Sequence, residues 1–433
     1  MANIQIKRSE ISGVIRCPSS KSYTHRAIAI ASLVERQSII KNILLARDTL
    51  ATLSACRSLG ANIIYNNGTL WIEGKRKFDT PENIINAENS GTTIRLLAVM
   101  SALVDKGFTI LTGDESLIKR PMQPLLDALR QLGVECYSTK MNGTPPLIVR
   151  GGGIKGGTAE IDGTVSSQFI SALLISSIYA ERDVTLKVKG PQVSAPYIDA
   201  TLATMKAFGV VIRHKTKLSE YYIGNNQYKP SIFDIPADFS TAALIIAAGI
   251  LAGSRLTIEG VNFLLPQADS YIFEIIKTMG GSIKINRYTG KIFVQGTSSL
   301  SGGNFDLTNS PDLLPVVSIL ALKSRKTVRI MGIGHSRLKE TDRVSNIAFE
   351  LAKFGANVKE QRDEISITAP KVVKNASLEA YNDHRLFMAF TIASMLTERS
   401  TVSGAESVDV SYPNFIKDMV NLGADIKPIS HRK

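Results

Sequence analysis

Hydrophobic and polar positions along the chain repeat one pattern six times. In each copy an apolar segment with helical periodicity runs up to a glycine, and these glycines are Gly60, Gly133, Gly209, Gly280, Gly355 and Gly423. Successive glycines are 73, 76, 71, 75 and 68 residues apart. Because a glycine just past a helix typically adopts the left-handed conformation that ends it, each predicts a helix end. Six copies at near-constant spacing indicate a repeat architecture.

Each copy also contains a second helix upstream and β-branched segments that predict strands. The upstream helices begin at PSSKSYTHR, ENSGTTIR, VSSQFISA, ADFSTAAL, NSPDLLPV and NDHRLFMA. They are apolar on all sides, which predicts that they are buried. A strand follows each glycine, usually with a turn and a second strand, as at Asn67-Gly68 and Asn142-Gly143. The predicted repeat is therefore helix, strand, helix, strand, strand.

Length and composition describe an ordinary globular protein. The chain has 433 residues, of which 44% are hydrophobic and 21% charged, so we expect two or three domains. A boundary between two triplets of repeats is expected near residues 230–236. The longest apolar stretch, 242–253, is shorter than the roughly 20 residues of a membrane span, and the N-terminus shows no secretion signal.

The cysteine content and the net charge indicate the redox compartment of the protein and the chemical class of its partners. The three cysteines, Cys17, Cys56 and Cys136, lack metal-type spacing and cannot all pair, which favours a reducing cytoplasm. Lys and Arg number 51 against 38 Asp and Glu, a surplus of +13 that favours anionic partners. Nucleic acid is disfavoured because no run of five basic residues occurs and aromatics are only 6%. A basic solvated surface accounts for most of these charges.

All six upstream helices begin with polar or charged residues. Ser, Asn and Asp often cap helices, and capping is the favoured interpretation for Asp238 and Ser240. At the other starts Lys, Gln, Arg or His stand beside the caps, which capping does not require. If the repeats are arranged with approximate symmetry, several positive helix N-termini would point at one centre and bind anions there.

Several helix starts offer residues for phosphate or carboxylate binding. Lys21, Ser22 and Arg26 share one start, and Gly91 at another would let a ligand approach the backbone. Arg120 precedes a helix and either clamps an anion or faces solvent. The remaining candidates, before or at the next helices, are Ser166, Ser167, Gln168, Ser194 and Tyr197, with capping as the alternative role of Ser194.

The sequence Lys-Glu-Thr-Asp-Arg at 339–343 is the most informative stretch. The next helix has an apolar stripe that, extended back one turn, reaches Glu340. A carboxylate heading a buried stripe is desolvated, which would raise the pKa of Glu340 and suit it to acid–base work. Lys339 and Arg343 would repel each other unless an anion lies between them. The alternative is a salt-bridged helix start involving Asp342.

Two further helix starts carry polar residues beyond what capping needs. Asp312 lies near the first turn of an apolar helix, although Asn309 and Ser310 are available as caps. His384, in Asn-Asp-His-Arg, is by itself more often a structural histidine than a catalyst. The glycine-rich segment 151–157 is not a phosphate-binding P-loop, because no Gly-Lys-Ser/Thr follows it.

Together these motifs resemble the 5-enolpyruvylshikimate-3-phosphate synthase family over nearly the whole chain. The resemblance rests on Ser-Lys-Ser-x-x-x-Arg, Asn-x-Gly-Thr-x-x-Arg, Arg-Pro, Ser-Ser-Gln-Phe, Lys-Glu-Thr-Asp-Arg and Asn-Asp-His-Arg in that order. It implies an α/β (α+β) fold, a two-domain inside-out α/β barrel of six βαβαββ repeats, three per domain. Domain I would comprise 1–18 and 236–433, domain II 19–235, with the active site in the cleft between them. The N-terminal strand would pack with the C-terminal half.

The resemblance also implies a reaction and a set of roles. The carboxyvinyl group of phosphoenolpyruvate passes to the 5-hydroxyl of shikimate 3-phosphate through a tetrahedral intermediate that loses phosphate. The implied catalytic residues are Asp312 for the hydroxyl proton and Glu340 and Lys21 for proton transfer at phosphoenolpyruvate. The implied shikimate 3-phosphate ligands are Lys21, Ser22, Arg26, Ser166, Ser167, Gln168, Ser194, Tyr197, Asp312 and Lys339. The implied phosphoenolpyruvate ligands are Lys21, Gly91, Arg120, Gln168, Arg343 and Arg385.

Some positions depart from the family pattern. Leu96 stands where some members have Pro, Val410 where some have Lys, and His335 where some have Asn. We expect no cofactor, no metal, no nucleic acid and no membrane partner, and a cytoplasmic monomer. Seven cations, including Arg95, are expected in one interdomain cleft.

Three competing functions stay open from the sequence. The nearest is that of the related transferase acting on UDP-N-acetylglucosamine, but its loop cysteine is absent near Arg120. An RNA-binding repeat protein is permitted by the charge, although the sparse aromatics disfavour it. A structural repeat scaffold would not need carboxylates and cations grouped at the helix starts.

Overall fold

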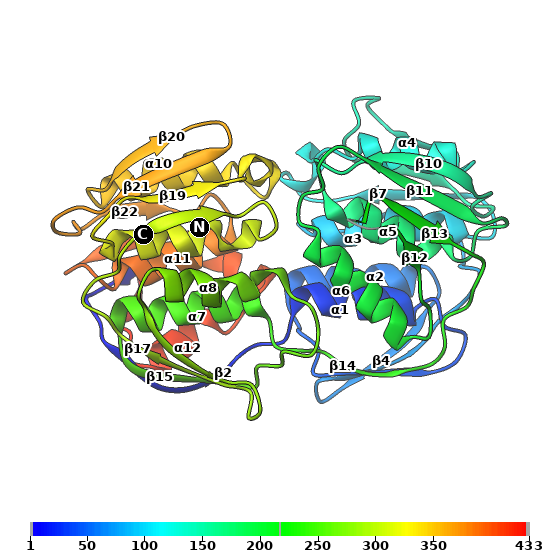
Figure 1. The fold of residues 1–433 in the computed structure, drawn as a ribbon. Coiled ribbons are helices and arrows are strands. Elements are labelled where there is room, and N and C mark those ends of the chain that lie inside the picture. Colours follow the sequence, from blue (N-terminus) through cyan, green and yellow to red (C-terminus); the bar gives the residue numbers. More distant parts are fainter. Residues whose placement is uncertain (1–2, 216–217, 430–433) are drawn as a thin grey trace. The chain divides into compact units, whose positions relative to one another are not determined.

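A computed structural model describes residues 3–215 and 218–429 of the chain. It divides into two compact units, drawn in Figure 1. Unit 1 contains Met1–Pro18 and Ala237–Lys433, and unit 2 contains Ser19–Pro236. Each unit has helices in its interior and sheets around them (Figure 1).

Unit 2 contains three repeats. Its helices are α1 (Lys21–Ala31), α2 (Arg47–Ser58), α3 (Gly91–Met100), α4 (Gln123–Gln131), α5 (Ser167–Ser177) and α6 (Pro196–Ala207). Its strands are β3 (Ser38–Lys41), β4 (Asn62–Asn66), β5 (Thr69–Glu73), β6 (Ile85–Asn86), β7 (Phe108–Thr112), β8 (Cys136–Ser138), β9 (Leu147–Arg150), β10 (Gly157–Asp162), β11 (Val184–Lys189), β12 (Arg213–His214), β13 (Glu220–Ile223) and β14 (Ile232–Asp234).

Unit 1 contains the other three. Its helices are α7 (Phe239–Ala252), α8 (Ile272–Thr278), α9 (Leu314–Leu320), α10 (Arg343–Lys353), α11 (His384–Ser394) and α12 (Phe415–Asn421). Its strands are β1 (Asn3–Ile6), β2 (Ile11–Arg16), β15 (Gly253–Glu259), β16 (Ser282–Asn286), β17 (Lys291–Gln295), β18 (Gly303–Asp306), β19 (Val328–Met331), β20 (Asn357–Glu360), β21 (Glu364–Thr368), β22 (Ser377–Glu379), β23 (Ser400–Ser403) and β24 (Ile426–Ile429).

The strands form six four-stranded sheets with one common pattern. In the order β6-β7-β9-β8, the first pair is parallel and the other two pairs are antiparallel. The other sheets follow the same rule when each is read from its parallel pair: β14-β3-β5-β4, β10-β11-β13-β12, β2-β15-β17-β16, β18-β19-β21-β20 and β22-β23-β1-β24. In four sheets a buried helix connects the two strands of the parallel pair, and in the other two the parallel pair joins strands from distant parts of the chain. The repeat is therefore βαβαββ, and the predicted order of elements is confirmed.

Two strands are exchanged where the chain passes between the units. Strand β2 leads into α1 but pairs in parallel with β15 of unit 1, while β14 leads into α7 but pairs with β3 of unit 2. Within unit 2 the Ser20 amide donates to the Pro236 carbonyl over 2.8 Å, and within unit 1 the Asp238 amide donates to the Pro18 carbonyl over 2.8 Å. Strand β1 completes the last sheet of unit 1 between β23 and β24. The first eighteen residues therefore belong with the C-terminal half of the chain.

Local backbone geometry confirms the predicted helix ends. All six repeat glycines have positive φ, between 75° and 113°. Asn67 and Gly68, with φ of 43° and 76°, form the predicted two-residue turn between β4 and β5. The turn predicted at Asn142-Gly143 is longer, because β8 ends at Ser138 and β9 begins at Leu147; Asn142 Oδ1 instead organises it by accepting from the Thr144 amide.

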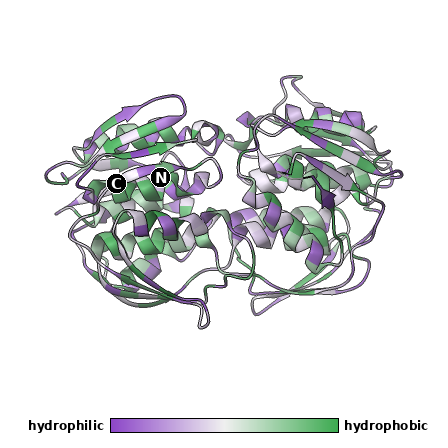
Figure 2. Ribbon diagram, viewed as in Figure 1, coloured by the Kyte–Doolittle hydropathy of each residue, from purple (hydrophilic) through white to green (hydrophobic). Residues whose placement is uncertain are grey.

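The apolar helices predicted to be buried form the core of each unit. Every residue of α7 is buried, and α3, α5 and α11 are buried over nearly their whole length. Figure 2 shows their apolar residues gathered in the interior and polar residues toward the loops. The N-terminal turns of α1, α3 and α5 keep partly exposed polar side chains, Lys21, Ser22, Thr92 and Gln168. Among the helices of the described residues, none is long and apolar enough to cross a membrane.

Candidate functional site

Three buried helices of unit 2 begin at serines that cap them. Ser20 accepts from the Tyr23 amide at α1, Ser90 from the Thr93 amide at α3, and Ser166 from the Gln168 amide at α5. The side chain of each serine thus satisfies a backbone donor that its helix leaves unpaired. Ser166, one of the predicted ligand residues, is therefore also a helix cap in this structure.

Arg26 is a buried cation surrounded by neutral groups. Its guanidinium donates to Thr201 Oγ1 (2.7 Å), to Ser22 Oγ (2.6 Å) and to the Tyr197 carbonyl (3.0 Å). Burial lowers the pKa of Arg26 to about 10, so it is charged at neutral pH. Among the described residues no carboxylate lies within 4.0 Å of it, and a bound anion would supply the missing counter-charge. Three predicted residues, Ser22, Arg26 and Tyr197, are thus brought together.

Lys21, on the same helix, has a carboxylate partner that the sequence did not predict. Its Nζ lies 3.0 Å from Oδ2 of Asp48, at the start of α2. The Asp48 side chain is buried, and it stands 27 residues from Lys21, so no local pattern links them. The pair holds the ammonium at the N-terminus of α1.

Gly91, Arg95 and Arg120 converge at the N-terminus of α3. A Cβ on Gly91 would lie 3.0 Å from Nη1 of Arg120 and 3.3 Å from Nη1 of Arg95. Arg120 is buried rather than solvent-facing and donates to Asn89 Oδ1 (3.0 Å) and Ser116 Oγ (3.2 Å). Two guanidinium groups therefore lie close together at one helix N-terminus, an arrangement suited to binding an anion.

Gln168 links this group to helix α5. Arg95 Nη1 donates to Gln168 Oε1 over 2.5 Å, and Gln168 Nε2 donates to Thr92 Oγ1 over 3.1 Å. Ser167 is buried in the first turn beside it. Ser194 is also buried, with φ +56°, but it caps nothing, because Ala195 is the N-cap of α6. Tyr197, expected before this helix, lies within its first turn.

In unit 1, Arg343 binds three carboxylates at once. Its Nη1 lies 2.9 Å from Asp312 Oδ1, its Nη2 lies 2.6 Å from Glu340 Oε2, and its Nε lies 2.7 Å from Asp383 Oδ2. Burial lowers the pKa of Arg343, but the charges of Asp383, Glu340 and Asp312 outweigh burial and raise it. One guanidinium therefore holds carboxylates from two neighbouring repeats, because Asp312 and Glu340 belong to the repeat of α9 and α10 and Asp383 begins the next one.

Asp312 is held on both of its oxygens. Its second oxygen, Oδ2, lies 2.8 Å from Nη2 of Arg385. Burial raises the pKa of Asp312, but Arg385, Lys339 and Arg343 together hold it well below its usual range. Asp312 is therefore an ionised carboxylate among cations, not a helix cap.

The prediction that helix α10 extends back to Glu340 is wrong. The helix begins at Arg343, because Asp342 caps it by accepting from the amides of Val344 and Ser345 over 3.1 Å each. Lys339 and Glu340 precede the helix, so the expected i,i+4 arrangement of Lys339 with Arg343 does not form. Glu340 reaches the site through its ion pair with Arg343 instead. The expected rise of its pKa stays a prediction.

Arg337 explains the position of Asp342. Its Nη1 lies 2.9 Å from Asp342 Oδ2 and 2.7 Å from Glu360 Oε1. The salt-bridged helix start considered for Asp342 therefore exists, and it lies beside the Arg343 cluster without replacing it.

Asp269 is a buried carboxylate near this cluster that the sequence did not indicate. Burial and the nearby charge of Asp312 raise the pKa of Asp269 to about 7. Ser240 donates its hydroxyl to Asp269 Oδ2, so the capping role expected for Ser240 is wrong, whereas Asp238 does cap α7 by accepting from the Thr241 amide. The contact joins two segments 29 residues apart, which no local pattern reveals.

The histidine of the Asn-Asp-His-Arg motif, His384, is buried at the start of α11. His384 follows Asp383, which caps the helix by accepting from the amides of Arg385 (2.9 Å) and Leu386 (3.3 Å). Across residues 3–215 and 218–429, no three His, Cys, Asp or Glu side chains gather as a metal site would require.

The two units differ in how their site cations are neutralised. In unit 2 the hydrogen bonds of Arg26, Arg95 and Arg120 described above go to neutral groups, and Lys21 pairs with Asp48. In unit 1 the cations Arg343 and Arg385 bind Asp312, Glu340 and Asp383. The hydrogen bonds described for the arginines in unit 2 are thus with neutral groups, whereas the contacts of Arg343 and Arg385 in unit 1 are with carboxylates.

Comparison with known proteins assigns the chain to one family. The family model described as EPSP synthase (3-phosphoshikimate 1-carboxyvinyltransferase) matches residues 6–419. The chain belongs to the EPSP synthase family. This confirms the family resemblance and the fold class inferred from the sequence.

Individual relatives extend the comparison. The 3-phosphoshikimate 1-carboxyvinyltransferase of Nitrosopumilus maritimus is 45% identical, covering 98% of this chain and 99% of that protein. That of Methanocaldococcus jannaschii is 42% identical, covering 97% and 98%. The structure of EPSP synthase from Acinetobacter baumannii superposes with a TM-score of 0.83 at 25% identity, over 99% of this chain and all of that one. The enolpyruvyl transferase NikO from Streptomyces tendae shares the fold, with a TM-score of 0.80 at 17% identity over 99% of both chains.

The three positions that depart from the family pattern, Leu96, Val410 and His335, can be located in the structure. Leu96 is buried in α3, and Val410 is buried just before the Ser411-Tyr412-Pro413 segment. His335 lies near Lys339 and Asp312; burial and the charge of Lys339 lower its pKa to about 4, which leaves it neutral at pH 7. Its buried Nε2 has no hydrogen-bond partner within the described part of the chain.

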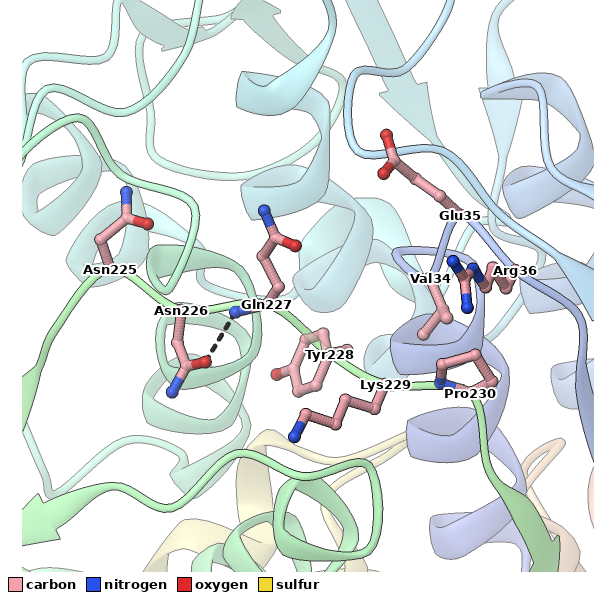
Figure 3. A pocket seen from close by; sticks show the side chains of 9 residues that line it. All are labelled: Val34, Glu35, Arg36, Asn225, Asn226, Gln227, Tyr228, Lys229 and Pro230. Atoms are coloured by element: carbon pink, nitrogen blue, oxygen red, sulfur yellow. Dashed lines mark hydrogen bonds between the residues drawn. The ribbon is translucent and has the colours of Figure 1, made fainter.

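A separate pocket of about 540 Å³ lies elsewhere in unit 2 (Figure 3). It is lined by Val34, Glu35, Arg36 and residues 225–230. None of the predicted site residues lines it. Val34 follows the C-terminal end of α1, whereas Lys21 begins that helix, so the pocket is distinct from the anion-binding group.

Proposed function

We propose that the chain transfers the carboxyvinyl group of phosphoenolpyruvate to the 5-hydroxyl of shikimate 3-phosphate and releases phosphate. These substrates together carry two phosphates and two carboxylates, so binding them requires cations that the protein does not neutralise itself. The observation that carries the proposal is the buried Arg26, whose hydrogen-bond partners are all neutral. Membership in the EPSP synthase family supports the same substrates.

Shikimate 3-phosphate is proposed to bind chiefly through unit 2. Arg26 with Ser22 and Tyr197 forms one group, and the first turn of α5 adds hydroxyl and amide donors near a helix N-terminus. The full proposed set is Lys21, Ser22, Arg26, Ser166, Ser167, Gln168, Ser194, Tyr197, Asp312 and Lys339. This assignment rests on the family resemblance and on the neutral surroundings of Arg26.

Phosphoenolpyruvate is proposed to use cations of both units in one turnover. Arg120 beside Gly91 would bind one anionic group without the crowding that a side chain at 91 would cause. Arg343 and Arg385 would bind another anionic group while they keep contact with Asp312. The full proposed set is Lys21, Gly91, Arg120, Gln168, Arg343 and Arg385. The interdomain position of the site stays a prediction.

Asp312 is proposed as the base that removes the 5-hydroxyl proton. Its low pKa makes it a weak base in the unliganded protein. Anions bound by Arg343, Arg385 or Lys339 would offset the positive charges that hold this pKa down. The base would then become stronger only when the substrates are present. Glu340 and Lys21 are proposed to supply the proton to the methylene carbon of phosphoenolpyruvate, which makes C2 open to attack by the hydroxyl oxygen.

A phosphate-release assay tests the proposed function. Purified protein is given phosphoenolpyruvate with shikimate 3-phosphate, or phosphoenolpyruvate with UDP-N-acetylglucosamine. We expect release only with shikimate 3-phosphate, and detection of the enolpyruvyl ether by mass spectrometry. Release only with UDP-N-acetylglucosamine would overturn the assignment of the acceptor. Release with neither acceptor would show that the chain does not catalyse this transfer.

The surroundings of the enzyme are proposed from the sequence alone. We propose a cytoplasmic monomer that needs no cofactor. Sedimentation velocity at micromolar concentration tests the monomer, and a species of twice the 47.0 kDa chain mass would contradict it. Retention of full activity after dialysis against a chelator tests independence from metal ions.

A further inference from the structure

The turn between β22 and α11 has a backbone that side chains rarely adopt. Tyr381 and Asn382 have φ of 51° and 56°, so two consecutive residues with side chains lie in the left-handed region. Such geometry costs energy and persists only where the surroundings hold it. The turn therefore needs an external restraint.

The residues directly after this turn belong to the proposed site. Asp383 accepts from Arg343 Nε over 2.7 Å and caps α11 through the amides of Arg385 and Leu386. Arg385 then reaches Asp312 with Nη2 at 2.8 Å. A shift of the turn would move the cap and Arg385 together.

Glu350 supplies the restraint from helix α10. Its carboxylate is fully buried and accepts from the Tyr381 hydroxyl (2.8 Å), the Glu379 amide (3.2 Å) and Lys353 Nζ (2.8 Å). Two of these donors lie on the segment that ends in the strained turn. The charge of Lys353 compensates a carboxylate that would otherwise be costly to bury.

Helix α10 therefore holds residues 379–383 at two points. Glu350 stands seven residues after Arg343, about two helical turns, so both side chains lie on the same side of α10. Glu350 holds Tyr381, and Arg343 holds Asp383. The same helix thus carries a guanidinium of the proposed site and the anchor for the turn that presents Arg385.

We propose that Glu350 and Tyr381 are positioning residues for phosphoenolpyruvate. They hold the strained turn so that Arg385 and Asp383 keep their places around Arg343 and Asp312. Neither residue needs to touch a substrate, because each acts through the turn. The inference rests on the proposed function for its kinetic part, while the restraint of the turn stands on the geometry alone.

The variant Tyr381→Phe tests this with little disturbance, since it removes one hydroxyl and keeps the ring. Amide hydrogen exchange of residues 383–386 reports whether the turn is held, independently of any activity. We expect exchange about tenfold faster, the KM for phosphoenolpyruvate raised about tenfold, and the KM for shikimate 3-phosphate changed less than twofold. Tyr228→Phe is the control, because it removes a different phenol hydrogen bond, the buried one to the Ile175 carbonyl (2.9 Å) in unit 2, and should change none of these quantities.

The variant Glu350→Gln separates positioning from general stability. A glutamine oxygen still accepts from Tyr381, so this variant should keep the phosphoenolpyruvate KM within about threefold even if its loss of the Lys353 ion pair lowers the melting temperature. Unchanged exchange in Tyr381→Phe would overturn the restraint. Faster exchange with an unchanged phosphoenolpyruvate KM, or an equal rise of both KM values, would mean that Tyr381 and Glu350 only stabilise the fold. Either result would overturn their proposed role in positioning Arg385. If the unsubstituted protein releases no phosphate, the proposed function fails, while the exchange measurement still decides whether the turn is held.

Discussion

Arg343 and Asp312 are joined over 2.9 Å between Nη1 and Oδ1 inside unit 1. Arg385 binds the other oxygen of Asp312, so both oxygens of the proposed base face guanidinium groups. These cations and Lys339 overcome the effect of burial and keep the pKa of Asp312 low. The carboxylate is therefore ionised across the physiological pH range, and what the substrates must change is its strength as a base.

The first prediction concerns the two carboxylates that Arg343 holds. Asp312→Ala and Glu340→Ala should each lower kcat by about 10²–10⁴, the range typical of a lost acid or base. Binding of shikimate 3-phosphate, measured by calorimetry, should survive in both because most of its proposed ligands lie in unit 2. Asp409→Ala removes an exposed carboxylate of the same unit and serves as the control. Near-normal turnover in either variant would exclude that residue from proton transfer.

The fold could be predicted because its signals are local. A helix end at Gly60 or Gly423 depends on a few neighbouring residues, and both glycines have the expected positive φ. The exchange of β2 and β14 leaves no such signal, since either strand could pair with its own repeat. Their strand character can be predicted from the sequence, whereas the strands with which they pair cannot.

The site could be predicted only in part, for the same physical reason. Arg26 and Asp312 were found from helix starts and motif order. Asp48 and Asp269 were missed because their partners lie 27 and 29 residues away and are chosen by tertiary packing. The apolar stripe of α10 does not continue back to Glu340, because Asp342 ends it as the N-cap, and an Asp two residues before Val344 is itself a sequence signal for such a cap.

A second prediction concerns the space at Gly91. Gly91→Ala places a methyl group 3.0 Å from Arg120 Nη1 and 3.3 Å from Arg95 Nη1, so one or both guanidinium groups must move. The KM for phosphoenolpyruvate should rise about tenfold, and the melting temperature should stay within about 2 °C because the displaced groups are ends of flexible side chains. Gly224→Ala is the control, since its Cβ would meet only Asp183 Oδ1 at an ordinary 3.7 Å. Equal kinetic effects of the two substitutions would contradict the argument.

A third prediction compares two buried arginines. Arg343→Met should destabilise the protein by about 3–5 kcal/mol, because it leaves Asp312, Glu340 and Asp383 without their shared cation. Arg26→Met should cost far less, since it removes a buried charge that has neutral partners only. The Thr201 hydroxyl can keep its own bonds to Ser171 Oγ and the Tyr197 carbonyl.

Arg26→Met should weaken substrate binding strongly although it changes the stability of the protein little. The affinity of Arg26→Met for shikimate 3-phosphate should fall at least a hundredfold, while its free energy of unfolding, measured in urea, should change by less than about 1 kcal/mol. Calorimetry with the folded variant gives the affinity. A large loss of stability in Arg26→Met would mean that the guanidinium serves the fold, and unchanged affinity would mean that the phosphate binds elsewhere.

The last prediction concerns Asp269, whose pKa in the folded protein is about 7 through burial and the charge of Asp312. In the unfolded chain an aspartate has a pKa of about 3.9, so between about pH 4 and pH 7 the folded state binds more protons than the unfolded state. The contribution of Asp269 to stability therefore falls as pH rises through this window and stays low above pH 7. Asp269→Asn mimics the protonated form and can still accept from Ser240, so it should be more stable than the unsubstituted protein at pH 8, by about 4 kcal/mol, and by only about 1 kcal/mol at pH 4.5. Urea unfolding at both pH values measures the difference, with Asp409→Asn as the exposed control. A stability difference that does not grow with pH would show that Asp269 is already ionised in the folded protein at low pH, and that Asp312 exerts no effective repulsion on it.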